Sequence, residues 1–392
     1  MLDASAIWLV PGLEHPAYKR FSAFFETLFT QYRALDYRQH YLDHGAASLR
    51  ESIASAVQQQ RPDILLYSQF PASYSYLSPG FMGALRDRAR IVALGFDDEI
   101  YFEQSKFFYL QCDAVITTDI PDAERLRAAG IPVHFAQLEA PQTSAADELV
   151  EEDIPISFIG DMTKPGRREL VQALEQAGIP VQDFGHGSRH GRLSDAEVRR
   201  VFRRSQINLN FTRTNPPAWI VRSHPARAVA YQIKGRPFEL AALKRFCLCE
   251  WGDCVEYWFE AGTEIGVFRD PAGLIAEARK YSADASLRHR MAAAAHDRYR
   301  QDYAPAVQFK RIFSEILSQP SKASSKHNGA AEPIFYESVG RSKASAFLHA
   351  LRRGRPLRAL REAMGEDATH MDYWRGFTGG VSDTVIAQMR RA

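Results

Sequence analysis

Residues 156–168 read ISFIGDMTKPGRR, and this stretch decides the class of fold. A short, unbroken apolar run over Ile156–Ile159 ends at a glycine and a basic loop, and a helical pattern follows over Arg167–Ala177. Apolar runs without alternation are typical of parallel strands buried on both faces of a sheet. The stretch therefore predicts a strand, a loop and a helix of an α/β fold.

The same strand–helix unit recurs along both halves of the chain, which predicts two doubly wound, Rossmann-like domains. The other strands are expected over Ala6–Val10, Asp63–Ser68, Ile91–Phe96, Ala114–Thr118, Val133–Ala136, Val181–Phe184, Ile207–Phe211, Phe246–Glu250 and Ile265–Phe268. Helices are expected over Tyr18–Arg33, Ala46–Gln59, Asp122–Ala129, Ser194–Arg203, Leu274–Tyr281 and Ser286–Tyr299.

Composition shifts divide the chain into two domains, two linkers and a tail. We expect a first domain over residues 1–140 and a second over residues 154–317. Residues 141–153 are small, polar and acidic, and they predict an interdomain linker. Residues 318–340 open on a stretch rich in Ser, Lys and Ala and predict a second, flexible linker. Residues 341–392 are expected to form a basic helical tail.

The overall composition excludes several classes of protein. The 392 residues include 45% hydrophobic and 24% charged residues, as in ordinary globular proteins. A net charge of +2 provides no general basic field for nucleic acid. The four cysteines do not form a disulfide framework, and no apolar run is long enough to span a bilayer. These observations favour a cytoplasmic location.

Two basic loops of the second domain are candidates for binding a diphosphate. In the first loop, Gly160 allows close approach of the backbone, Lys164 and Arg168 supply cations, and the following helix offers free N–H groups. An ordinary βα turn with a solvated basic face explains this loop equally well.

The second loop reads KGRPFE over residues 234–239. Lys234 and Arg236 could face phosphate, Gly235 precedes the helix start, and Glu239 could accept both hydroxyls of a ribose. The alternative for Glu239 is stabilisation of its own helix dipole, which needs no ligand.

Candidate catalytic residues follow two strands of the first domain. Asp97 and Asp98 close a buried strand, where a carboxylate can act as a base or bind sugar hydroxyls. An N-cap role at Asp97 or Asp98 explains the pair equally well. His15 lies in the loop after the first strand and could serve as a base, although a lone loop histidine usually does not.

The succession of motifs resembles the CgeB-type, or spore-maturation-like, glycosyltransferases over about residues 5 to 317. In the first domain, the Asp97-Asp98 pair and DAVITT at 113–118 carry the likeness. The second domain carries SFIG at 157–160, LSDAE at 193–197, INLNF at 207–211, KGRPFE at 234–239 and FEAGTEI at 259–265.

The resemblance implies a GT-B fold whose two domains face a cleft. A nucleoside diphosphate sugar would be the donor substrate, bound mainly by the second domain, and a glycan, lipid-linked or protein acceptor would bind the first. Glu239 matches the second glutamate of the E-x7-E element in related retaining enzymes, whose expected role is to bind the ribose. Tyr231 stands where the first glutamate is expected, and Lys244 stands where the family usually has glycine.

Transfer without a metal ion and without a bound cofactor is expected, because the chain has no D-x-D motif and its basic loops can stabilise the diphosphate. Retention is favoured over inversion. Two alternatives stay open: a sugar-nucleotide epimerase on the same fold, and an inactive GT-B module that acts as a scaffold or regulator.

The tail combines charge with apolar side chains. Residues 341–361 hold seven basic and no acidic residues, with Leu348, Leu351, Leu357 and Leu360 on an apolar side. One hypothesis is that this segment makes a peripheral contact with the inner membrane face. The alternative, which we favour slightly, is that it docks on an acidic patch of the protein itself or of a second subunit.

Overall fold

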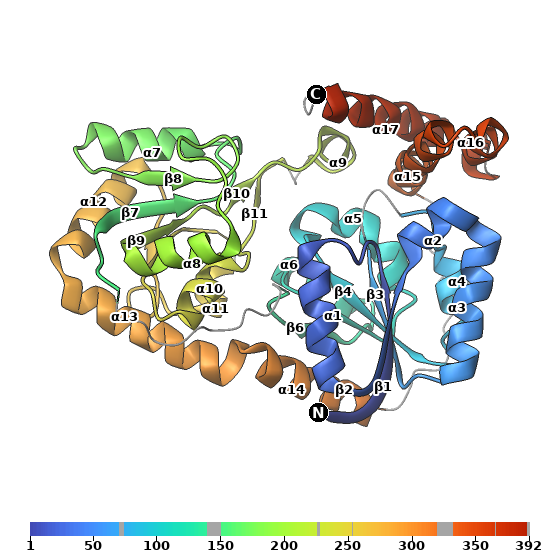
Figure 1. Cartoon of the computed structure of the whole chain (residues 1–392), viewed down its shortest axis with the longest axis horizontal. Coiled ribbons are helices and arrows are strands. Elements are labelled where there is room, and N and C mark those ends of the chain that lie inside the picture. Colours follow the sequence, from blue (N-terminus) through green and yellow to red (C-terminus); the bar gives the residue numbers. More distant parts are fainter. Residues whose placement is uncertain are drawn as a thin grey trace. The chain divides into compact units, whose positions relative to one another are not determined.

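The chain forms two α/β units, each built on a parallel sheet (Figure 1). The computed structural model describes residues 1–69, 74–138, 150–225, 228–252, 254–319, 332–364 and 366–389. The first unit comprises residues 1–140 and 310–392, and the second comprises residues 141–309. The C-terminal residues therefore belong to the unit that the N-terminal residues begin.

The sheet of the first unit has the strand order β2-β1-β3-β4-β5-β6, and all neighbouring strands are parallel. All five residues of β3 are buried, as its unbroken apolar run predicts. The strands are β1 (Leu2–Val10), β2 (Phe29–Asp36), β3 (Ile64–Ser68), β4 (Arg90–Gly95), β5 (Ala114–Thr117) and β6 (Val133–Phe135). The helices among them are α1 (Pro16–Leu28), α2 (Tyr37–His44), α3 (Ala46–Gln60), α4 (Pro79–Gly83), α5 (Asp98–Tyr109) and α6 (Ile120–Ala128).

The first predicted helix extends too far. We expected a helix over Tyr18–Arg33, but α1 ends at Leu28 and the chain enters β2 at Phe29. β2 forms a parallel ladder with β1 along the sheet edge. The prediction was wrong for residues 29–33 because pairing with β1, a tertiary interaction, overrides local helix propensity.

The sheet of the second unit has the strand order β13-β12-β9-β7-β8 and is also parallel. Its strands are β7 (Ile154–Ile159), β8 (Gln182–Phe184), β9 (Ser205–Asn210), β12 (Cys247–Glu250) and β13 (Gly266–Phe268). The helices are α7 (Arg167–Gln176), α8 (Asp195–Arg204), α9 (Ala218–Ser223), α10 (Arg236–Ala242), α11 (Val255–Trp258), α12 (Pro271–Ala283) and α13 (Ala285–Arg298). A short π-helical turn, Tyr299–Tyr303, follows α13.

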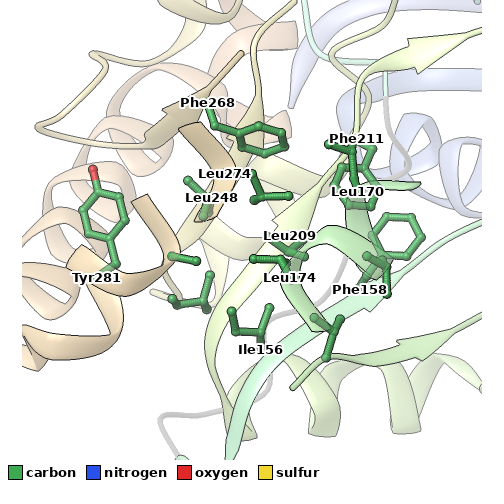
Figure 2. Packing of buried hydrophobic residues seen from close by; sticks show 14 of the residues in the cluster. Ile156, Phe158, Leu170, Leu174, Leu209, Phe211, Leu248, Phe268, Leu274 and Tyr281 are labelled. Atoms are coloured by element: carbon green, nitrogen blue, oxygen red, sulfur yellow. The ribbon is translucent and has the colours of Figure 1, made fainter. Parts of the chain in front are cut away.

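The core of the second unit lies between its sheet and the helices α7 and α12 (Figure 2). Leu209 and Leu248 on central strands pack with Leu174 of α7 and Leu274 of α12, and each is at most 2% exposed. This core supports the strand ends from which the basic loops leave.

A small hairpin that the strand pattern did not predict lies between β9 and α10. Its strands are β10 (Arg213–Thr214) and β11 (Ala230–Tyr231), which pair in antiparallel fashion. Arg213 stands opposite Tyr231 in this ladder. The hairpin therefore places Tyr231, for which the resemblance predicts a glutamate, beside an arginine.

The C-terminal helices differ from the predicted linker and tail. α14 (Pro305–Ser318) passes from the second unit into the first, followed by α15 (Pro333–Arg352), α16 (Pro356–Ala363) and α17 (Met371–Met389). The linker prediction was wrong for residues 333–340, which are helical because α15 packs along α17. The linker predicted at 141–153 lies outside the described residues except for 150–153. None of the described helices is long and apolar enough to cross a bilayer.

The tail packs on the first unit, although Arg358 binds backbone oxygens there and not the acidic patch that the alternative predicted. Tyr41 of α2 donates a hydrogen bond to Glu362 of α16 at 2.7 Å, and Lys343 of α15 lies 3.1 Å from the same carboxylate. Arg358 donates to the backbone oxygens of Asp43, at 2.8 Å, and of Tyr41. The basic residues on this side of the tail therefore bind backbone and carboxylate oxygens within the unit.

Candidate functional site

The loop after β7 is closely packed at its glycines. A Cβ on Gly160 would lie 2.7 Å from the Phe158 ring, so this residue is limited to glycine by packing, before any ligand is considered. Gly185, at the end of β8, has φ +116°, and a Cβ there would overlap the Gly160 carbonyl oxygen. The two strand ends are thus held side by side.

Three basic side chains of this loop have different surroundings. Arg167 is 8% exposed and donates to the backbone oxygens of Asp161, at 3.0 Å, and Phe211, at 3.2 Å. Burial lowers the pKa of Arg167. Arg168 donates to the Gly187 oxygen at 2.8 Å. Lys164 lies 3.4 Å from the Thr214 hydroxyl. Arg167 therefore holds the loop together, whereas Lys164 and Arg168 lie at its rim.

The start of α10 joins this loop. Gly235 is the N-cap of α10, and Arg236 and Glu239 form an ion pair of 2.5 Å in its first turn. The Arg236 guanidinium lies 4.7 Å from the centre of the Phe202 ring and donates to the Ile159 backbone oxygen at 3.4 Å. The two basic loops predicted from sequence therefore meet at the carboxyl end of β7. Lys234, just before the helix, is exposed.

The sequence interpretation missed two charged residues at the same sheet edge. Glu250, at the end of β12, is 3% exposed and accepts hydrogen bonds from the backbone N–H groups of Thr212, at 3.0 Å, and Arg213, at 3.1 Å. The Arg213 guanidinium lies 3.5 Å from this carboxylate and is close to the start of α7, where a Cβ on Gly166 would be 3.4 Å away. The sequence did offer a signal for Glu250, because this residue stands at the end of the predicted strand Phe246–Glu250.

In the first unit, Tyr18 links two of the predicted catalytic residues. Its ring centre lies 5.4 Å from that of His15 and 5.8 Å from that of Phe96, which immediately precedes Asp97. Burial, together with the Asp97 charge, raises the pKa of Tyr18 well above its usual range, and that of Tyr101 to about 12. The carboxyl ends of β1 and β4 thus place His15 and Asp97 around one tyrosine.

Asp98 has a different environment from its neighbour. Asp97 is the N-cap of α5, with a left-handed φ of 58° and no capping hydrogen bond from its side chain. Asp98 is 1% exposed and accepts hydrogen bonds from Tyr109 at 2.6 Å and Thr117 at 2.7 Å. Burial raises the pKa of Asp98 to about 7. The adjacent carboxylates therefore separate, with Asp97 half-buried at the edge and Asp98 in the interior.

The described residues contain no cluster of three or more His, Cys, Asp or Glu side chains that could hold a metal ion. The polar groups gathered at the edge of the second unit's sheet include guanidinium, ammonium and backbone N–H groups, and the carboxylates of Glu239 and Glu250 beside them are engaged with Arg236 and Arg213. Such groups suit a polyanionic ligand with two or more phosphates.

Comparisons with known proteins agree with this architecture. Residues 166–314 match a family model described as "Glycosyl transferase-like". Sucrose-phosphate synthase from Thermosynechococcus elongatus is similar with a TM-score of 0.56 and 10% identity, covering 81% of this chain and 100% of that one. HepE from Anabaena, solved in complex with UDP and glucose, is similar with a TM-score of 0.55 and 10% identity. The likeness covers 81% of this chain and 100% of HepE.

TarM, a protein of S. aureus, is similar with a TM-score of 0.51 and 10% identity over 69% of this chain. This chain spans only 58% of the length of TarM. A search of curated proteins found no match. The likenesses establish that the chain has the GT-B fold, as the resemblance implied.

Proposed function

We propose that this protein transfers a sugar from a nucleoside diphosphate sugar to an acceptor, as a CgeB-type glycosyltransferase. The observation that carries the proposal is the contact of Arg236 with the end of β7, since it brings both basic loops to one strand end. The match of residues 166–314, which include Arg168 and Arg236, to the glycosyl transferase-like family supports it.

The second unit would hold the donor. Lys164, Arg168 and Lys234 would face the diphosphate at the rim, with Gly160 and Gly235 presenting backbone beside it. Arg236 would stabilise the charge that develops on the leaving diphosphate, so no metal ion is required. Glu239, held by Arg236 at 2.5 Å, would orient the ribose. We propose retention, in which the donor phosphate itself accepts the proton of the acceptor.

The first unit would hold a glycan, lipid-linked or protein acceptor. His15 and Asp97, half-buried or exposed at the carboxyl edge of its sheet, would bind acceptor hydroxyls. Asp98 is buried and both its oxygens accept hydrogen bonds, so we assign it a positioning role behind Asp97. The four free thiols fit a reducing compartment, and we propose that the enzyme acts in the cytoplasm.

Donor binding tests the site directly. Calorimetry with a panel of nucleoside diphosphates should identify one that binds, and Arg236→Ala should weaken it about tenfold or more, because a charge-assisted hydrogen bond contributes about 1.5–3 kcal/mol. Arg290→Ala, which removes an arginine from α13 of the same unit, is the matched control. Unchanged affinity in both Arg236→Ala and Glu239→Ala would contradict the proposed site.

Nucleotide release from the matching sugar nucleotide separates transfer from its alternatives. A transferase releases nucleotide faster when acceptor is added, an epimerase converts the donor without acceptor, and an inactive module does neither. The inactive alternative has one specific observation in its favour, namely that Tyr231, which pairs with Arg213, stands where the resemblance to related retaining enzymes predicts the first glutamate of the E-x7-E element.

Asp97→Asn should lower turnover with acceptor about tenfold while leaving donor affinity within about twofold, since one charge-assisted hydrogen bond to the acceptor is lost. Asparagine tolerates the left-handed backbone at this position, so the fold should survive. Steady-state kinetics and donor titration measure the two quantities. An equal loss in both would place Asp97 at the donor instead.

A further inference from the structure

Helix α16 carries its apolar face outward. Leu357 is 83% exposed and Leu360 59%, whereas Ala359, Glu362 and Ala363 are buried. Met364, one turn beyond Leu360 and directly after the helix, is 63% exposed. A surface helix ordinarily turns its leucines to the core and its charges to water. The orientation of α16 is the reverse.

Contacts on the buried side fix this orientation. Glu362 accepts hydrogen bonds from Tyr41 at 2.7 Å and from Lys343 at 3.1 Å. The Tyr373 hydroxyl donates to the Ala363 backbone oxygen at 3.0 Å, and Arg358 donates to that of Asp43 at 2.8 Å. Because three helices of the first unit, α2, α15 and α17, hold α16 from this side, its leucines cannot turn inward without breaking a buried ionic network.

The exposed leucines are surrounded by positive charge. Arg352, Arg353, Arg355 and Arg361 are all exposed. The only acidic residue among residues 351–364 is Glu362, which is 6% exposed and engaged with Lys343. Within the described part of the chain, Arg352 and Arg361 form no ion pair or hydrogen bond. The surface of residues 351–364, which we call the α16 face, is therefore both apolar and basic.

Exposed apolar side chains are concentrated in this part of the protein. Among the described residues, nine of thirteen exposed large hydrophobic side chains lie between Leu351 and Met389. These include Met371 and Trp374 of α17. Helix α17 packs along α15, which also contacts α16 (Figure 1). Such clustering distinguishes an interaction surface from the scattered apolar residues of an ordinary surface.

We propose that the α16 face binds the surface of an anionic lipid bilayer, with the leucines inserted at the headgroup boundary and the arginines against lipid phosphates. Charge complementarity selects this occupant. In a two-fold dimer, the α16 face of one copy would contact the same face of the other copy. The four arginines of each copy would then lie against those of its partner. This proposal does not depend on the transfer reaction.

Vesicle cosedimentation of the full chain tests the proposal. The protein should bind vesicles of equal parts phosphatidylglycerol and phosphatidylcholine, should bind phosphatidylcholine alone at least tenfold more weakly, and should lose binding to the mixed vesicles at high salt. Leu357→Ser/Leu360→Ser and Arg352→Gln/Arg361→Gln should each weaken binding to the mixed vesicles about tenfold or more.

Two control variants change the same chemistry elsewhere. Lys310→Gln/Arg311→Gln removes two exposed charges from α14, and Val229→Ser/Val307→Ser removes two exposed apolar side chains; both should bind as the wild type does. Thermal melts should show that every variant is folded. Equal binding to both vesicle types, or undiminished binding by the leucine variant, overturns the proposal. A dimer in light scattering that the leucine variant converts to monomer, without lipid binding, would assign the face to self-association.

Discussion

Gly376→Ala should destabilise the first unit by about 2 kcal/mol, although alanine is the better helix former by about 1 kcal/mol. Gly376 lies in α17, where a Cβ would overlap the backbone carbonyl oxygen of Glu337 in α15. Gly340 on α15 meets the backbone of Tyr373 in the same way. The two helices therefore touch backbone to backbone, and one methyl group must push them apart.

The neighbouring Gly379→Ala is the matched control. A Cβ there would lie 2.7 Å from the end of the Arg341 side chain, which can move at little cost. This variant should be neutral or slightly stabilising. Amide hydrogen exchange over α15 and α17, together with thermal melts, measures the difference. Equal stability of the two variants would show that the helices do not pack as closely as described.

Asp98→Asn should stabilise the protein relative to the wild type, and increasingly so as the pH rises from about 4 to about 7. Burial raises the pKa of Asp98 to about 7 in the folded state, against about 3.9 for an exposed aspartate. The folded protein therefore holds a proton that the unfolded chain has lost, and the wild type loses stability across this interval. The full effect is at most about 4 kcal/mol, since one pKa unit corresponds to about 1.4 kcal/mol.

Asparagine can replace the neutral carboxyl because its oxygen accepts from one hydroxyl while its amide group donates to the other. Chemical denaturation of both proteins at pH 4 to 8 gives the difference in unfolding free energy. A difference independent of pH would show that Asp98 is ionised throughout.

Glu103→Gln is the control variant, and it should lower the free energy of unfolding where Asp98→Asn raises it. Burial alone would raise the pKa of Glu103, but hydrogen bonds from Arg125 and Lys106 lower it to about 2. This carboxylate contributes stability above about pH 4.5, which is lost as the pH falls toward 2. Its replacement should therefore cost stability that stays constant from pH 5 to 8, whereas the Asp98 effect grows until the pH reaches about 7.

The sequence by itself determined the fold class and the positions of the buried strands. Unbroken apolar runs such as Ile64–Ser68 and Ile156–Ile159 are fully or almost fully buried strands, because only a sheet covered on both faces can accommodate them. It also drew attention to both basic loops of the second domain. Only the first follows a strand of the parallel sheet; the second follows β11 of the small antiparallel hairpin, and its place beside the end of β7 came from the structure.

Only the tertiary structure decided how individual side chains are used. Asp97 and Asp98 are adjacent in sequence, yet one stays at the sheet edge and the other enters the interior, because the helix start turns successive residues to different sides. Residues 29–33 became a strand through pairing with β1, and α16 exposes its leucines because Glu362 is held from the other side. These outcomes depend on contacts between residues far apart in the chain, and local pattern carries no information about such contacts.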